Sequence, residues 1–95
     1  MMIVARLDGV VVARSGDYIE VENSLYFPRS DVLMNFLVET QTRTRCPWRG
    51  IATYFDVAVS GRVISDAAWS YEKPKIKARR IQNYIAFWKD IDISN

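Results

Sequence analysis

The chain has no histidine and only one cysteine, Cys46, among its 95 residues. The lack of histidine excludes imidazole proton relays, histidine-dependent catalytic triads and histidine metal sites. A lone cysteine can form neither an internal disulfide nor a cysteine cluster for zinc, so we expect no bound metal.

Long apolar runs and leader-like patterns are also missing. No apolar run approaches the roughly 18 residues that a membrane span needs, and no charged-then-apolar signal peptide precedes the first strand pattern. With one free thiol and no export signal, we expect a cytoplasmic protein without a membrane partner. The length and the 49% apolar and 25% charged residues are typical of one globular domain, predicted over residues 1–95.

Charge and aromatic residues are unevenly distributed. Residues 1–40 carry three basic and six acidic groups, whereas residues 41–95 carry ten and five. The net charge of +2 is too small for a general nucleic-acid coat, so we do not expect a nucleic-acid partner. The basic second half, which also holds most of the aromatic residues, is suited to a small anionic or planar ligand.

Short β-rich segments separated by turn residues dominate the first 27 residues. Asp8-Gly9 is a strong hairpin signal, and Ser15-Gly16 and Asn23-Ser24 indicate further turns. The pattern predicts an antiparallel meander.

The middle of the chain leaves two readings open. Ser30 is a candidate N-cap, and residues 31–38 fit either a helix or one helical turn followed by an extended segment. Residues 39–45 hold three threonines and no large apolar side chain, which indicates a loop or an exposed sheet edge.

The second half contains the strongest strand pattern, Ile51–Val59, followed by a turn at Ser60-Gly61-Arg62. Extended segments are then expected to Tyr71, a short helix from Lys75 to Ile81, and a last strand over residues 84–88. Residues 90–95 are expected to fray, leaving a core of about residues 4–89. The sequence thus predicts a mainly β, compact antiparallel domain with one or two short helices.

The densest cluster of reactive and charged groups is Arg43-Thr44-Arg45-Cys46-Pro47-Trp48-Arg49-Gly50. Neighbouring arginines lower the pKa of a thiol and favour the thiolate, so one hypothesis is a reactive Cys46 or an arginine-lined anion pocket. The alternative is a small apolar Cys46 packed at the entry of a strand beside solvated arginines. The absence of a histidine base favours the second reading.

A second group consists of amphipathic aromatic residues. Such side chains either pack at the rim of a core or form the wall of a ligand site. Its members are Tyr54, Trp69, Tyr71 and Tyr84, with Trp48 and Trp88 as further candidates.

The third group is a run of five cations between Lys73 and Arg80. Such a run is either a solvated face or a phosphate site, and no aromatic residue interleaves it, which weakens the case for nucleic acid. There is also no convergent carboxylate pair, no P-loop and no dinucleotide fingerprint, so no cofactor is expected.

Taken together, four segments resemble the small, mainly bacterial domain-of-unknown-function 427 family over about residues 4–89. The segments are Tyr26–Val32, Cys46-Pro47-Trp48-Arg49-Gly50 through Tyr54, Ala68–Pro74 and Tyr84–Trp88. The resemblance implies a fold of the β-tent (Mss4-like) group, similar to zinc-binding and methionine sulfoxide reductase B domains. Those relatives use paired Cys-x-x-Cys knuckles, which this chain lacks, so zinc is not carried over.

The family also carries a nucleotidyltransferase label, which no carboxylate pair supports here. Many members have histidine immediately before the motif cysteine, where this chain has Arg45. That position is therefore interpreted as a source of polarity or positive charge rather than as a proton relay.

The leading hypothesis is a non-catalytic domain that binds a small molecule or peptide. Its pocket is predicted to comprise Trp48, Tyr54, Trp69 and Tyr71 as walls, with Arg29, Arg45 and Arg49 supplying charge beside Cys46. The first alternative is an enzyme that uses Cys46 as nucleophile or arginines in phosphoryl or nucleotidyl transfer. The second is a protein-interaction module that uses the edge near residues 40–44 or the basic run.

Overall fold

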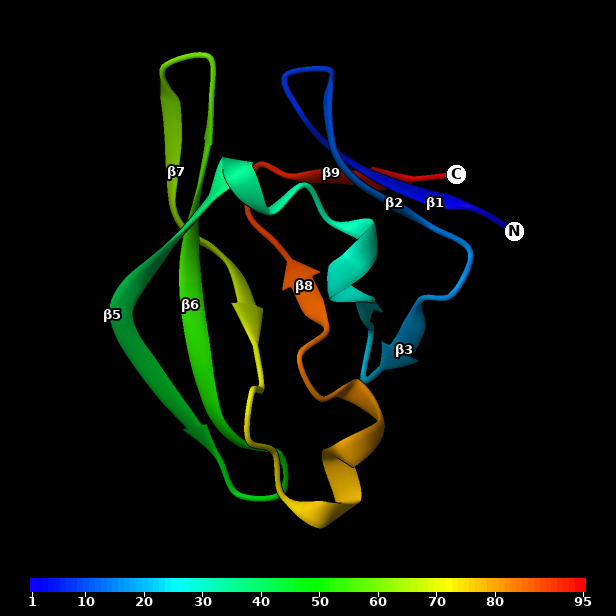
Figure 1. Ribbon diagram of the computed structural model, residues 1–95, viewed down its shortest axis with the longest axis vertical. Helices are drawn as coiled ribbons and strands as arrows, with labels where there is room; N and C mark the ends of the chain where they lie inside the picture. The colour runs from blue at the N-terminus through cyan, green and yellow to red at the C-terminus, as the bar shows by residue number, and fades with distance from the viewer.

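The fold is built from nine short strands and three turns of 3-10 helix, described for all residues 1–95 by a computed structural model (Figure 1). The mainly β prediction is confirmed. The strands are β1 (Ile3–Leu7), β2 (Val10–Ser15), β3 (Ile19–Val21), β4 (Ser24–Phe27), β5 (Leu37–Cys46), β6 (Gly50–Val59), β7 (Arg62–Ser70), β8 (Ile85–Phe87) and β9 (Asp92–Ser94). The helical turns are η1 (Arg29–Asp31), η2 (Met34–Phe36) and η3 (Ile76–Ile81). No helix is long and apolar enough to cross a membrane.

The strands form two antiparallel sheets. The smaller has the order β2-β1-β9, and the larger has the order β3-β4-β8-β7-β6-β5. In the large sheet β5 and β6 are the longest pair, and β5 is an edge strand. Of the two readings for residues 39–45, the exposed edge is therefore the one found.

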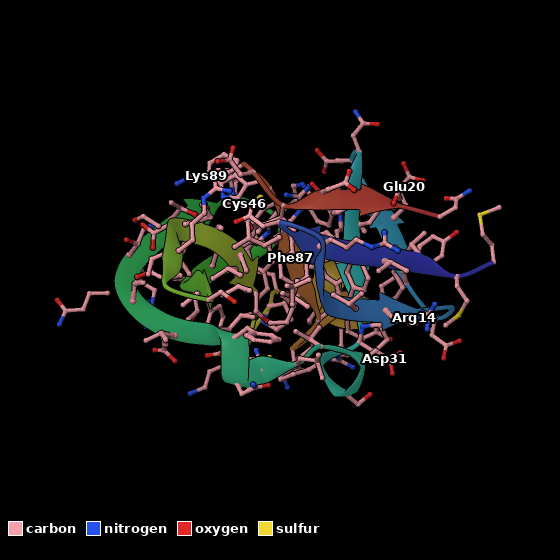
Figure 2. The ribbon with its side chains drawn as sticks, turned by 90° about the horizontal axis from the view of Figure 1, so that it is seen from above. Arg14, Glu20, Asp31, Cys46, Phe87 and Lys89 are labelled. Atoms are coloured by element: carbon pink, nitrogen blue, oxygen red, sulfur yellow. The ribbon has the colours of Figure 1, made fainter.

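The principal core lies between the two sheets. Leu7 and Val12 of the small sheet belong to the same buried cluster as Phe27, Val57 and Phe87 of the large one. The rings of Phe27 and Phe87 meet edge to face with centroids 5.6 Å apart. Seen from above, Phe87 lies inside the molecule while exposed side chains such as Arg14 project outward (Figure 2).

The opposite face of the large sheet carries a second, smaller core. Because successive side chains of a strand point to opposite faces, the neighbours of the principal-core residues point to this side. Tyr26, Ala52 and Ala86 lie here, and Ala78 and Ile81 of η3 cover part of them. The aromatic side chains that this face leaves uncovered form the candidate site.

The helical segments are shorter than a regular α-helix. Of the two readings for residues 31–38, the structure agrees with a brief turn followed by an extended segment, because η2 ends at Phe36 and β5 starts at Leu37. Pro74 precedes the helix expected over residues 75–81, which is the single 3-10 segment η3.

The predicted N-terminal meander is wrong, since β2 and β3 belong to different sheets. The buried Ser15 hydroxyl donates to Asp31 at 2.6 Å and accepts from the Asp17 amide at 2.9 Å. These bonds hold the bend at residues 16–18, which carries the chain from one sheet to the other.

The C-terminal residues also differ from expectation. We expected residues 90–95 to fray, whereas β9 pairs with Val4–Arg6 of β1 and Ile91 is buried in the principal core. Alternating isoleucines at 91 and 93 supply the apolar contacts that hold this strand.

Candidate functional site

A row of aromatic side chains crosses four strands of the large sheet. Tyr54 of β6 is paired with Trp69 of β7, which is paired with Ala86 of β8, which is paired with Tyr26 of β4. Because Ala86 is small, the Trp69 ring reaches across it and donates from Nε1 to the Tyr26 hydroxyl at 3.2 Å. The order of the strands thus places Trp69 at the centre of the row.

Trp69 contacts aromatic rings on three sides. It meets Tyr26 and Trp88 edge to face, with centroids 6.2 and 5.9 Å away, and the tilted ring of Tyr54 at 6.4 Å. Trp88 is itself held by a 2.6 Å bond from its Nε1 to the carbonyl of Asp66. Such contacts fix ring orientation, so the aromatic walls are preorganised.

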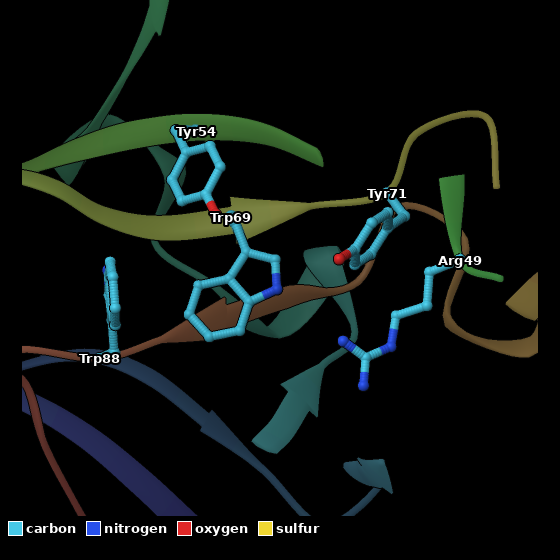
Figure 3. A pocket seen from close by; sticks show the side chains of 5 residues that line it. All are labelled: Arg49, Tyr54, Trp69, Tyr71 and Trp88. Atoms are coloured by element: carbon cyan, nitrogen blue, oxygen red, sulfur yellow. The ribbon is translucent and has the colours of Figure 1, made fainter. Parts of the chain in front are cut away.

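Beside Trp69 lies an open cavity of about 200 Å³, lined by Arg49, Tyr54, Trp69, Tyr71 and Trp88 (Figure 3). Small-molecule pockets typically measure roughly 300–1,000 Å³, so this space suits a single planar group rather than a large ligand. No carboxylate lines it. The arginine lies on the Tyr71 side, and the cavity therefore has an aromatic end and a cationic end.

Arg49 is held by three neighbours. Its Nη2 lies 2.9 Å from Oε1 of Glu22, and its guanidinium stands 4.9 Å from the Trp48 ring centroid and 6.0 Å from that of Tyr71. Its Nε is buried and has no hydrogen-bond partner in the protein. An unpaired buried donor costs about 1–3 kcal/mol.

The ionisation of the neighbouring groups favours a neutral phenol beside a cationic guanidinium. Burial raises the pKa of the Tyr71 hydroxyl, and Arg49 only partly opposes this effect. Burial also raises the pKa of Tyr26, against the hydrogen bond from Trp69. For Arg49, burial acts to lower the pKa, but Tyr71, Tyr26 and the Glu22 carboxylate outweigh it, so that its pKa is raised.

Comparison with known protein families agrees with the sequence motifs. The family model described as "Domain of unknown function (DUF427)" matches residues 1–94. The chain belongs to the DUF427 family. No curated protein matched the chain.

The structure of this DUF427 domain brings together four of the residues proposed from its sequence. Arg49, Tyr54, Trp69 and Tyr71 all line the cavity. Trp48 does not. It lies in a separate groove and reaches the site only through its stacking on Arg49.

Two of the three proposed arginines lie away from the cavity. Arg29 donates to Ser70 Oγ at 3.1 Å and to Glu72 at 3.2 Å, and it stands over the Phe55 ring. Ser70 follows Trp69 directly, so its side chain points to the other face of the sheet. Arg45 follows Thr44, whose hydroxyl bonds to Tyr54, and alternation turns this exposed arginine away as well.

Cys46 is half-buried and packs against the second core instead of lining the cavity. Of its arginine neighbours, Arg43 is paired with Glu39 at 2.9 Å. No group of three or more His, Cys, Asp or Glu side chains lies close enough together to hold a metal ion. The geometry offers no contact that favours Cys46 as a nucleophile.

Sequence reasoning missed two parts of the site. Trp88 was only a further candidate, because it follows a strand that the sequence could not place beside β7. Glu22 belongs to the distant β3–β4 turn, and nothing in the linear sequence connects it to Arg49. For Trp88, the only indication in the sequence was its position at the end of a predicted strand.

Arg49 is positioned by the tight turn between β5 and β6. Gly50 adopts a φ of +113°, and an added Cβ would lie 3.4 Å from the amide of Lys75, which donates to the carbonyl of Arg49 at 2.9 Å. The turn is therefore packed directly against residues 73–75.

We expect Gly50→Ala to lower the free energy of unfolding by about 1–3 kcal/mol, because alanine resists this backbone conformation. Urea unfolding measures the change. Gly61→Ala is the control: its φ of +81° lies closer to the left-handed region that alanine can adopt than the +113° of Gly50, so its loss should be smaller. Equal losses in the two variants would contradict a special role for the backbone conformation of Gly50.

Proposed function

We propose that this domain binds a small planar molecule, or a planar side chain of a peptide, that carries a carboxylate or a similar anionic group. One observation carries the proposal: an aromatic-walled cavity ends at the cationic side chain of Arg49, and no carboxylate lines it. A planar group would lie among Tyr54, Trp69 and Trp88, and its anionic end would accept from the guanidinium.

The positive charge of Arg49 disfavours cationic ligands. Aromatic cages that bind ammonium groups exploit the negative faces of the rings. Here the cationic Arg49 stands at one end and no carboxylate lines the cavity to compensate a bound cation. An anion is therefore the preferred charged partner.

The proposal is tested with matched aromatic acids and amides, such as nicotinate with nicotinamide and benzoate with benzamide, in a thermal-shift titration. Each pair keeps the ring and changes the charge. We expect the acids to bind at least tenfold more tightly, and saturation at one hundred times Kd adds about 2.7 kcal/mol of stability. Absence of binding by every acid, or equal binding of acids and amides, would overturn the anionic assignment.

Glu22 provides an internal control for the anionic assignment, because its carboxylate already forms an ion pair with Arg49 and would compete with an anionic ligand. This side chain is 60% exposed, and an exposed ion pair is worth about 0.2–1 kcal/mol. Glu22→Gln is therefore expected to tighten binding of the acids by about two- to fivefold and to leave the amides unchanged. A weaker acid affinity in this variant would show that Glu22 supports the ligand rather than competing with it.

A further inference from the structure

The β5–β6 turn meets the loop before η3 at one end of the molecule (Figure 1). A second concave surface lies there. It is a groove of about 590 Å³ lined by Pro47, Trp48, Pro74, Lys75, Ile76 and Lys77. Only Arg49, which stacks on Trp48 and lines the cavity, connects it to the candidate site.

The two walls of this groove are fixed to each other. Nζ of Lys75 donates to the carbonyl of Pro47 at 2.7 Å, and its amide donates to the carbonyl of Arg49 at 2.9 Å. The prolines add rigidity, since each fixes its own φ. The groove therefore exists before any partner binds, which lowers the entropic cost of binding.

The groove combines exposed apolar groups with unpaired positive charge. Trp48 is 37% exposed and Ile76 is 79% exposed. None of the five cations between Lys73 and Arg80 has an acidic partner within 4 Å. Two of these cations, Lys75 and Lys77, line the groove beside the exposed apolar side chains. A partner that complements this surface carries an apolar group next to acidic groups.

We infer that this groove binds an acidic peptide segment, with one apolar or aromatic side chain seated between Trp48 and Pro74 and flanking carboxylates facing the lysines. A concave surface with two fixed walls fits an inserted side chain. A nucleic acid would need a basic path along several phosphates, whereas two lysines line this groove in a chain of net charge only +2. The inference is independent of the ligand proposed for the aromatic cavity.

The test uses an array of peptides with one varied residue between two pairs of glutamates, beside the same array with glutamine replacing every glutamate. The strongest binder is then labelled and titrated by fluorescence polarisation. We expect binding by acidic peptides with Leu, Phe or Trp at the varied position and at least tenfold weaker binding by their glutamine counterparts. No binding by any acidic peptide, or equal binding by both arrays, would overturn the inference.

Variants locate the binding surface. Ile76→Ser and Lys77→Gln change highly exposed side chains and should leave the fold intact, and each should weaken peptide binding by at least fivefold. The matched controls are Val63→Ser, 58% exposed on β7, and Arg14→Gln, exposed on β2 of the small sheet. Equal affinities for groove and control variants would overturn the assignment.

A single-stranded oligonucleotide and anionic lipid vesicles are titrated in parallel. Tighter binding of either at the same salt concentration would assign the groove to that partner and contradict the peptide. Nicotinate provides the remaining control, because it should not displace the peptide if the groove and the cavity are separate sites.

Discussion

Trp69→Ala is expected to weaken binding of the aromatic acids by at least a hundredfold, equivalent to about 2.7 kcal/mol. Trp69 is the one residue of the cavity that contacts Tyr26, Tyr54 and Trp88 together. Its removal takes away the central stacking surface and also frees the neighbouring rings to move. Calorimetric titration with nicotinate measures the loss.

This substitution also removes the partner of the fully buried Tyr26 hydroxyl, so stability must be measured alongside binding. Trp69→Phe keeps a ring at the site and separates the two effects, because it should lose stability while retaining part of the affinity. Circular dichroism verifies the fold of each variant. A folded Trp69→Ala protein with unchanged affinity would exclude the cavity as the ligand site.

Two other tryptophans form a matched comparison. Trp88 lines the cavity and Trp48 does not, although both are partly exposed. Trp88→Ala should weaken acid binding about tenfold, and Trp48→Ala should change it by less than threefold. The sequence-based pocket, which included Trp48, predicts a large effect for the latter variant.

Ile91→Ala is expected to lower the free energy of unfolding by about 2–4 kcal/mol, the usual cost of truncating a buried isoleucine. Ile91 is 6% exposed and belongs to the principal core. For a domain of this size the melting temperature should fall by about 10–20 °C. Differential scanning calorimetry and urea unfolding measure both quantities.

Ile76→Ala is the control, since the same substitution at a 79% exposed site should cost less than about 0.5 kcal/mol. Similar small losses in both variants would mean that the C-terminal segment contributes little, as a frayed tail would. A large loss in Ile91→Ala alone would establish β9 as part of the folded unit.

Local patterns predicted individual elements well. The long β-branched and aromatic run from Ile51 to Val59 is β6, and the Asp8-Gly9 hairpin forms with φ of +52° and +81° at the two residues. These features depend on side-chain shape and backbone freedom within a few consecutive residues, and both can be inferred from residue type.

Arrangement in space was predicted less well. The meander failed because β2 and β3 do not pair: Ser15, at the end of β2, bonds to Asp31, sixteen residues away, and the chain then bends to the other sheet. The fraying of residues 90–95 failed because the partner of β9 is the first strand of the chain. Neither the Ser15–Asp31 bond nor the β1–β9 pairing can be predicted from the residues next to it in the sequence.

The sequence by itself determined a mainly β fold, the family, an arginine-rich segment at residues 43–50 and a group of amphipathic aromatic residues in the second half of the chain. Tertiary structure decided which of those side chains meet. The strand order placed Trp69 across Ala86 from Tyr26, and alternation turned Arg45 away from the cavity that Arg49 lines. Alternation also put Ser70, the partner of Arg29, on the other face of the sheet. Sheet pairing joins residues that are remote along the chain, and a one-residue shift reverses the face on which a side chain lies.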